Sequence, residues 1–370
     1  MRPKTLRGVF RAIVAGAACL SQAAFACTGI VLEGEDGTVV RSRTMEWGSF
    51  DLLSAISVVP PGHEMASLMP DGSEGLAWTT KYGFVGATGL GRLLVTDGLN
   101  EMGLSGGLFY LPGFAEYPDY DPAMSDVSVS PSDVMGYILG SFASVDEVRE
   151  GVSGIRIVAV SEEALGFPAP VHYIVSDPTG ETIVIEVVGK ETRIHESPLR
   201  VITNSPPYDW HMTNLRNYLN LSATSLPTQS VAETDFSPLG AGSGMLGLPG
   251  DFTPPSRFVR AVAFSQTARP TDGGFDTVRE SFRILDNFNV PVSGVGHDAD
   301  AEGEEVLSAT QFTSAADLRE LRFYYHTQHN RRVRMVDLKA IDFDAMDGEP
   351  ITMLMDEARA EDIETITLEP

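Results

Sequence analysis

Cysteine is nearly absent from this chain. Among 370 residues there are two, Cys19 and Cys27. The first lies in segment 1–26, which has a basic start, an apolar run over residues 12–20 and the small-x-small sequence Ala24-Phe25-Ala26, the pattern of a secretory signal peptide. If that segment is removed, Cys27 is the single cysteine left, which excludes an intrachain disulfide. The fold must then be stabilised by its packed core.

Positive charge is also scarce. Segment 1–26 holds four of the 26 basic residues and no acidic one, so residues 27–370 carry 22 basic against 51 acidic residues, a net charge of about −29. This excess argues against nucleic acid and an anionic membrane surface as partners. After the leader, no apolar run approaches the ~20 residues that span a bilayer. We therefore expect an exported protein, periplasmic or secreted, whose residues 27–370 form one domain with an acidic C-terminal tail.

Removal of this leader would make Cys27 the first residue of the chain. Cleavage after Ala26 would leave a thiol and a free α-amino group on one residue, and an amine of pKa ~7.7–8.0 is a base near neutral pH. Two other interpretations stay open from the leader alone. Cys27 could be a buried small hydrophobic residue, or the lipidated cysteine of a lipoprotein, although Ala24 occupies the position where that signal normally has leucine.

The remaining sequence reads as one α+β domain. Strands are predicted at Thr28–Glu33 and 38–45, joined through Gly34-Glu35-Asp36-Gly37, a hairpin signature. Further strands are expected at 52–59, 78–88, 93–96, 104–111, 172–176 and Thr182–Val188, with a last hairpin from 321–327 and 332–338. Helices are expected at 131–142, capped by Ser130, at 145–152, opened by Ser144, and at 209–219, 256–264 and 276–288. Segments 266–275 and 297–305 read as surface loops.

Three stretches carry polar residues in unusual places. Arg43 and Glu46 lie on the second predicted strand, Asn204 follows a strand, and Arg257 starts a helix after Leu248-Pro249-Gly250-Asp251-Phe252-Thr253-Pro254. Each signal is weak when taken alone. Arg43 and Glu46 could form a surface ion pair of little energetic value, and Asn204 could cap a turn.

Together with Cys27, these stretches resemble the choloylglycine hydrolase family of bile salt hydrolases and penicillin V acylases. The resemblance runs from Cys27 to about Leu338. It rests on Cys27-Thr28-Gly29, on the Arg-x-Met-acid strand, on Asp97-Gly98-Leu99-Asn100-Glu101, on the stretch from Asn204 to Trp210 and on the segment that ends at Arg257. It implies the four-layered αββα sandwich of N-terminal-nucleophile hydrolases, hydrolysis of a linear amide through an acyl-thioester, and no cofactor.

The resemblance also implies a role for each residue. Cys27 would attack the amide carbonyl, with its own α-amine relaying the proton. Arg43 would lie beside the thiol, where a cation favours thiolate. Glu46 would hold the α-amine, Asn204 would stabilise the oxyanion, and Arg257 would lie near the nucleophile.

Two positions depart from the bile salt hydrolases. Glu46 replaces an aspartate and adds one methylene, which changes the geometry of its contact with the amine but not its charge. Tyr110 aligns with their asparagine, and a tyrosine there resembles penicillin V acylases. We therefore predict that an aromatic acyl group is favoured and that penicillin V is cleaved at least as well as glycocholate. Loops 50–61 and 112–130 are expected to line the pocket; an ordinary core aromatic is the other interpretation of Tyr110.

Other signals are discounted. The glycine-rich run 240–247 continues into an irregular segment and lacks the strand and helix of a phosphate-binding loop. His326 and His329 lie in a predicted hairpin without an acidic partner at zinc spacing, so no metal site is expected. The alternatives in function are an N-acyl homoserine lactone acylase and a non-catalytic periplasmic lipoprotein that binds amphiphiles. By analogy with the family, a homotetramer is expected to be compatible with stretch 208–251.

Overall fold

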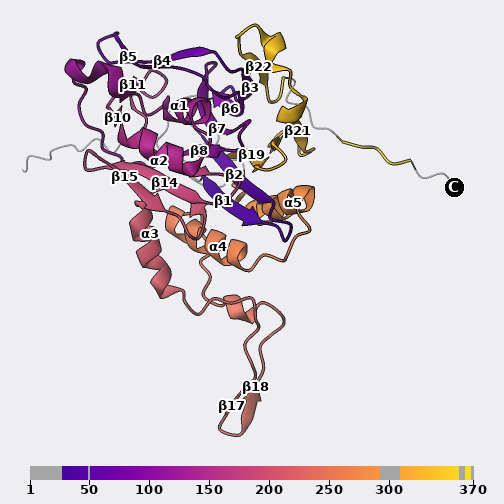
Figure 1. The fold of residues 1–370 in the computed structure, drawn as a ribbon. Coiled ribbons are helices and arrows are strands. Elements are labelled where there is room, and N and C mark those ends of the chain that lie inside the picture. Colours follow the sequence, from indigo (N-terminus) through magenta and orange to yellow (C-terminus); the bar gives the residue numbers. More distant parts are fainter. Residues whose placement is uncertain (1–26, 49–50, 292–308, 358–362, 368–370) are drawn as a thin grey trace, which may run out of the picture.

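The protein is described here by a computed structural model that covers residues 27–48, 51–291, 309–357 and 363–367. The predicted leader 1–26 and the acidic segment 297–305 lie outside the described residues. Two large antiparallel sheets form the centre of the molecule (Figure 1). The first has the strand order β16 (Val201–Ile202), β1 (Thr28–Glu33), β2 (Val39–Trp47), β19 (Ala309–Asp317), β20 (Arg322–Thr327) and β21 (Arg334–Asp337).

The second sheet has eight strands. Their order is β15 (Glu191–Glu196), β14 (Thr182–Val188), β13 (Val171–Ser176), β8 (Ser105–Tyr110), β7 (Leu94–Asn100), β6 (Phe84–Gly89), β3 (Ala55–Val59) and β22 (Ile351–Leu354). Part of the acidic C-terminal stretch thus adds the edge strand β22. Smaller strand pairs are β4 (Glu64–Leu68) with β5 (Glu74–Thr79), β9 (Ser128–Val129) with β10 (Arg156–Ile157), β11 (Ser161–Glu162) with β12 (Phe167–Pro168), and β17 (Gln229–Val231) with β18 (Thr234–Phe236).

Helices cover the outer faces of both sheets. Helices α4 (Pro254–Gln266) and α5 (Gly274–Leu285) pack on the first sheet, and α1 (Val134–Ser141) and α2 (Val145–Ser153) pack on the second. A further helix, α3 (Tyr208–Asn214), follows β16. The order of layers is therefore helix, sheet, sheet, helix (Figure 1). This confirms the predicted αββα sandwich.

Strand periodicity decides which side chains lie between the sheets. On β13, Tyr173 and Val175 belong to the apolar cluster under α1 and α2, whereas Ile174 belongs to the cluster that joins the two sheets. Because alternate residues of a strand face opposite sides, His172 shares the inner face with Ile174. On β14 the same alternation places Glu186 inside, with Val184. The layer between the sheets therefore holds a histidine and a glutamate within an apolar core.

Most predicted elements are present, with three corrections. The run 78–88 is not one strand, because β5 ends at Thr79 and β6 begins at Phe84 with a turn between them. The first helix begins at Val134, and the residue before it is Asp133, which makes no side-chain capping bond; Ser130 is not its cap. Ser144 does cap α2, accepting a hydrogen bond from the Glu147 amide. Strand β19, which pairs with β2 in the middle of the first sheet, was not predicted.

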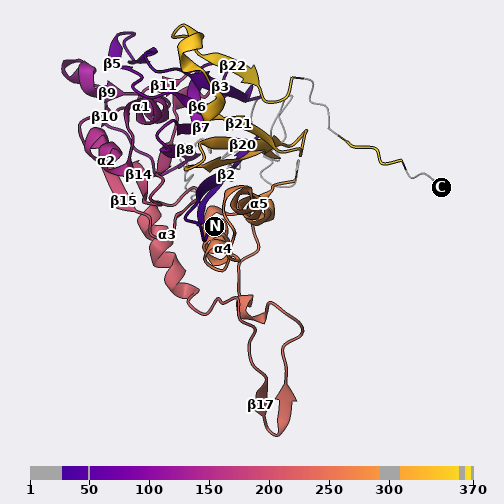
Figure 2. The ribbon, with the colours of Figure 1, turned by 45° about the vertical axis from the view of Figure 1, so that its right-hand side comes forward.

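The stretch between α3 and α4 leaves the body of the molecule. It carries the β17–β18 hairpin, which projects away from both sheets in two views (Figures 1 and 2). Both strands of the hairpin are fully exposed along their length. No helix in the described part of the chain has the length and apolar character needed to cross a membrane.

Candidate active site

Cys27 lies directly before β1, at the point where the first sheet meets a pocket. Its Sγ is 3.9 Å from the Met45 Sδ and 4.0 Å from the main-chain oxygen of Glu46. Only 3% of the residue is exposed. Burial raises the pKa of the Cys27 thiol, against the opposing effect of Arg43. The thiol is therefore protonated at neutral pH.

Arg43 lies on β2 opposite Gly29 of β1. Its Nη1 donates to the carbonyl oxygens of Thr96 at 2.8 Å and Leu108 at 2.6 Å, and its Nη2 lies 3.5 Å from the Met45 Sδ. The guanidinium carbon lies 4.1 Å from the centre of the Phe109 ring. All of these partners are neutral, so the positive charge of Arg43 is not cancelled by a hydrogen-bonded carboxylate. Its field acts on the Cys27 thiol, where a nearby cation lowers the pKa.

Glu46 is fully buried three residues further along β2, on the opposite face of the strand from Arg43. Its carboxylate accepts from the hydroxyl of Thr310 at 2.7 Å and from that of Thr44 at 3.0 Å. Burial raises the pKa of Glu46 to about 7, although Arg257 and the two hydroxyls act to lower it. The surface ion pair weighed for Arg43 and Glu46 does not form, since both side chains are buried and their hydrogen bonds go to other residues.

Arg257 joins two parts of the site. The turn before α4 is ordered by Asp251, which accepts from the hydroxyl of Ser256 at 2.7 Å, and Pro254 and Pro255 suit the first helical turn. From this first turn, the guanidinium of Arg257 donates to the Cys27 carbonyl oxygen and, at 2.6 Å, to the side-chain oxygen of Asn204. Burial lowers the pKa of Arg257 to about 10, so it remains charged at neutral pH.

Asn204 follows β16 and its amide orientation is set by its neighbours. The side-chain oxygen accepts from Arg257, so the amide nitrogen is the atom that donates to the Tyr110 carbonyl oxygen at 2.7 Å. An amide nitrogen carries two hydrogens, and one of them is used by this bond. The contact with Arg257 thus settles which side-chain atom of Asn204 is the oxygen and which is the nitrogen, an assignment that is usually ambiguous for asparagine.

The pocket beside Cys27 is almost entirely apolar. Tyr110 closes β8 and meets the Trp47 ring edge to face, with the ring centres 6.2 Å apart. Burial raises the pKa of Tyr110 to about 12, so its phenol is neutral. The pocket is lined by Cys27, Met45, Glu46, Trp47, Leu52, Gly89, Leu90, Leu94, Thr96, Leu108, Tyr110, Ser132, Glu162, Leu165, Ala169 and Val171.

The prediction of the lining loops was half right. Segment 50–61 contributes Leu52, but 112–130 contributes none of the lining residues. The far wall comes instead from the segment of β11 and β12, through Glu162, Leu165 and Ala169. The described residues contain no group of three or more histidine, cysteine, aspartate or glutamate side chains arranged for a metal ion.

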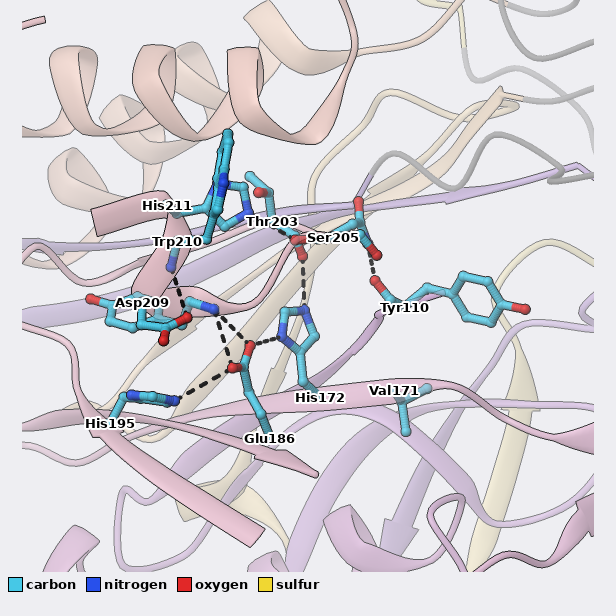
Figure 3. A network of polar contacts seen from close by, with 12 residues as sticks. Tyr110, Val171, His172, Glu186, His195, Thr203, Ser205, Asp209, Trp210 and His211 are labelled. Carbon is cyan, nitrogen blue, oxygen red and sulfur yellow. Dashed lines mark hydrogen bonds and ion pairs between the residues drawn. The ribbon is translucent and has the colours of Figure 1, made fainter. Parts of the chain in front are cut away.

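Sequence reasoning missed the polar residues behind Asn204. Figure 3 shows the buried residues His172, Glu186 and His211. His172 forms a hydrogen bond with Glu186, and His211 forms one with the carbonyl oxygen of Asn204. Burial alone would raise the pKa of Glu186, but hydrogen bonds from His172 and His195 lower it to about 2. A signal existed in the sequence, because the ionisable residues His172 and Glu186 share the inner face of their strands with Ile174 and Val184.

Comparisons with known proteins agree with this arrangement. Residues 27–352 match the linear amide C–N hydrolases of the choloylglycine hydrolase family. The bile salt hydrolase/transferase of Clostridium perfringens is 29% identical over 323 residues, which cover 86% of this chain and 94% of the relative. The penicillin V acylase of Pectobacterium atrosepticum is 26% identical, covering 82% of this chain and 78% of the relative.

Solved structures give the same result. A variant of the conjugated bile acid hydrolase from Clostridium perfringens superposes with a TM-score of 0.78 at 27% identity and covers 92% of this chain and all of its own. The penicillin V acylase of Agrobacterium tumefaciens, at 24% identity and a TM-score of 0.71 over 89% of this chain and 91% of its own, shares the fold. The sandwich defines an N-terminal-nucleophile hydrolase fold. This chain belongs to the choloylglycine hydrolase family and is a linear amide C–N hydrolase.

Proposed function

We propose that the processed chain cleaves its amide substrate through Cys27 as an N-terminal nucleophile. The observation that carries this proposal is the double contact of Arg257, which donates both to the Cys27 carbonyl and to the Asn204 side chain. A single buried cation thereby contacts both the sulfur-bearing residue, which lines the apolar pocket, and an amide donor. The family match, which begins at residue 27, supports the same starting point.

The chemistry follows from a buried, protonated thiol. Removal of the leader would free the α-amine of Cys27, which takes the thiol proton while the sulfur attacks the substrate carbonyl. The C–N bond of the resulting tetrahedral intermediate then breaks, and the departing amine takes the proton back. This leaves an acyl-thioester on Cys27 and a free amine. A water molecule, deprotonated by the α-amine, hydrolyses the thioester and regenerates the thiol.

Asn204 and Arg43 are proposed to stabilise the negative charges that develop during the reaction. The second N–H of Asn204 would donate to the oxyanion, a contribution whose loss costs ~10²–10³ in rate in comparable sites. Arg43 would stabilise negative charge on the sulfur through its uncancelled field. Glu46 would accept a hydrogen bond from the α-amine and hold it in place, since its hydroxyl partners, Thr44 and Thr310, leave further acceptor positions on the carboxylate.

The pocket favours an apolar acyl group. Trp47 and Tyr110 already meet edge to face, and an aromatic ring added to such a pair gains ~0.5–1.5 kcal/mol beyond area burial. We therefore propose phenoxyacetyl amides such as penicillin V as substrates, cleaved at least as well as conjugated bile acids. Acyl homoserine lactones are the second candidate, because Leu52, Leu94 and Leu165 would accept an alkyl chain equally well.

Export and assembly are proposed with the activity. The leader pattern and the requirement for a free amine both favour a periplasmic or secreted enzyme. The projecting β17–β18 hairpin, with Val231 and Phe236 exposed, is suited to contact further copies of the chain in a homotetramer. Light scattering of the processed protein would test this proposal, with a monomer at micromolar concentration as the contrary result.

The decisive experiment is a substrate panel on the processed protein. Penicillin V, glycocholate, taurocholate and a series of acyl homoserine lactones would be compared by kcat/KM, with Cys27→Ser as the matched control. We expect wild-type turnover of at least one amide and none with serine, which lacks the nucleophilicity of a thiolate. Intact mass should show an unmodified Cys27 at the N-terminus. Diacylglycerol on Cys27, or near-normal turnover by Cys27→Ser, would refute the proposed mechanism.

A further inference from the structure

Two histidines hold the main chain on either side of the Asn204 amide. The Nε2 of His172 lies 3.2 Å from the Thr203 carbonyl oxygen, and the Nε2 of His211 lies 2.9 Å from the Asn204 carbonyl oxygen. A carbonyl oxygen can only accept, so both nitrogens carry hydrogen. Figure 3 shows His172 between Thr203 and Glu186, and His211 on the other side of this segment. Two consecutive peptide carbonyls are therefore fixed by imidazole N–H groups.

The two histidines differ in their second nitrogen. The Nδ1 of His172 lies 2.8 Å from a carboxylate oxygen of Glu186. His172 therefore contacts Glu186 through one ring nitrogen and Thr203 through the other. The Nδ1 of His211 is buried without a hydrogen-bond partner. Burial lowers the pKa of His211 to about 4, so this ring is neutral and its single hydrogen is on Nε2.

The residues packed around His172 hold its ring in place. From β8, the Phe109 ring meets the imidazole edge to face at 6.4 Å. Glu186 lies on β14, and His195 on β15 lies 3.4 Å from the other oxygen of that carboxylate. From α3, the Tyr208 amide donates to both oxygens of Glu186 at 3.1 Å. Glu186 is the single anion that contacts His172 among the described residues, and His172 is less than 2% exposed.

We propose that His172 is a positioning residue for the oxyanion donor Asn204, and that Glu186 holds the His172 ring in the orientation for this role. The inference rests on the proposed function of Asn204. The peptide bond between Thr203 and Asn204 sets where the amide nitrogen of Asn204 points. Since His172 holds the carbonyl of that peptide bond, loss of the N–H would let the donor move. A misplacement of about 1 Å in a catalytic group can cost on the order of 10²-fold in rate.

A matched pair of variants separates this role from general stability. In His172→Gln, the side-chain amide nitrogen takes the place of Nε2 and can still donate to Thr203. In His172→Asn, the amide nitrogen takes the place of Nδ1 and can reach only Glu186. Both variants place a neutral amide at position 172. His63→Gln is the control, because the His63 ring nitrogen contacts the carbonyl of Gly348 at 3.0 Å, outside this network.

Two rates are measured on each folded variant. The first is kcat on the best amide of the substrate panel, and the second is alkylation of Cys27 by iodoacetamide, which forms no oxyanion. We expect His172→Asn to lose about tenfold or more in kcat, with KM changed by less than about threefold. His172→Gln should keep kcat within about threefold of wild type. Alkylation rates should stay within about twofold in both.

Equal values of kcat for the two variants would overturn the proposal, as would alkylation that falls in parallel with kcat. If an unpaired buried Glu186 prevents either single variant from folding, the same pair is made in the Glu186→Gln background, where the expected ratio is unchanged. The proposed function and the inference about His172 can be refuted separately. A wild-type protein that cleaves no amide refutes the proposed function and this inference with it, whereas an active wild type with equal Asn and Gln variants refutes this inference alone.

Discussion

Glu46 and Glu186 are two fully buried glutamates that the fold treats in opposite ways. Burial raises the pKa of Glu46 to about 7, with two hydroxyls as its hydrogen-bond partners. Burial would also raise the pKa of Glu186, but two histidines and the Tyr208 amide outweigh it and bring the pKa to about 2. Exposure is 0% in both cases. The charge of a buried carboxylate is therefore decided by its donors and not by its depth.

This difference in pKa distinguishes two regions of the molecule, one around Glu46 and Cys27 and one around Glu186. Around Glu46 and Cys27, a carboxylate and a thiol both have raised pKa values, and the two oxygens of Glu46 accept from hydroxyl groups. Buried groups with shifted pKa values cluster at functional sites. Around Glu186, the carboxylate accepts from an imidazole nitrogen and from a main-chain amide, which lower its pKa. Asn204 stands between them, bonded to Arg257 by its side chain and to His211 by its main chain.

The largest effect is expected from replacing Asn204, which lies between these two regions. Asn204→Ala should lower kcat by ~10²–10³ with a smaller change in KM, because the donor acts on charge that develops in the transition state. Steady-state kinetics on the best amide of the panel would measure it. A loss confined to KM would assign Asn204 to substrate binding instead and would remove the boundary between the two regions.

Glu186→Gln tests the region around Glu186 through stability. A folded-state pKa of about 2, below the usual 4.5, means that the stabilisation is fully present above pH 4.5 and is lost as the pH falls through 2. We expect the variant to lose about 3 kcal/mol of unfolding free energy at pH 7, from about 1.4 kcal/mol per pKa unit, and progressively less below pH 4.5. Urea denaturation across this range would show it, with the exposed Glu35→Gln as control. A loss that does not depend on pH would contradict the lowered pKa of Glu186.

Glu46→Gln should change the unfolding free energy in the opposite direction from Glu186→Gln. A folded-state pKa of about 7, above 4.5, means that ionisation of Glu46 weakens the fold as the pH rises from 4.5 to 7. The glutamine variant should therefore be more stable than wild type at pH 8 and equal to it at pH 4. Because the α-ammonium of a processed Cys27 would compensate part of the cost, we expect a gain of only about 1 kcal/mol. Activity should fall, since the amine loses its anchor; a fully active variant would refute that role.

The smallest effect concerns Tyr110. Its carbonyl serves Asn204, while its ring lines the pocket. Tyr110→Asn keeps the carbonyl and should shift the ratio of kcat/KM for penicillin V over glycocholate toward glycocholate by about threefold to tenfold, as expected from ~0.5–1.5 kcal/mol of ring contact. The matched Tyr110→Phe variant should leave the ratio unchanged. A wild-type preference for glycocholate that Tyr110→Asn does not alter would show that this ring does not set specificity.

Sequence patterns were sufficient for the elements that carry the reactive residues. Local turn, strand and proline signals that hold in the structure predict the β1–β2 hairpin, the strand position of Arg43 and Glu46, and a helix whose first turn carries Arg257. Strand β19 was missed, because its alanine, threonine and serine residues give little hydrophobic alternation. Its hydroxyl at Thr310 is nonetheless one of the two that bind Glu46.

What the sequence alone determined is the family, the layered fold and the set of polar residues spaced around Cys27, because these depend on local periodicity and on motifs that can be compared along the chain. What only the tertiary structure decided is which of those residues meet. Arg257 lies 230 residues from Cys27 yet donates to its carbonyl, and His172 meets Glu186 because antiparallel pairing places them side by side between two sheets. The charge of each buried group follows from those contacts, since a pKa depends on the donors and charges within a few ångströms. A local sequence pattern does not predict which groups these are.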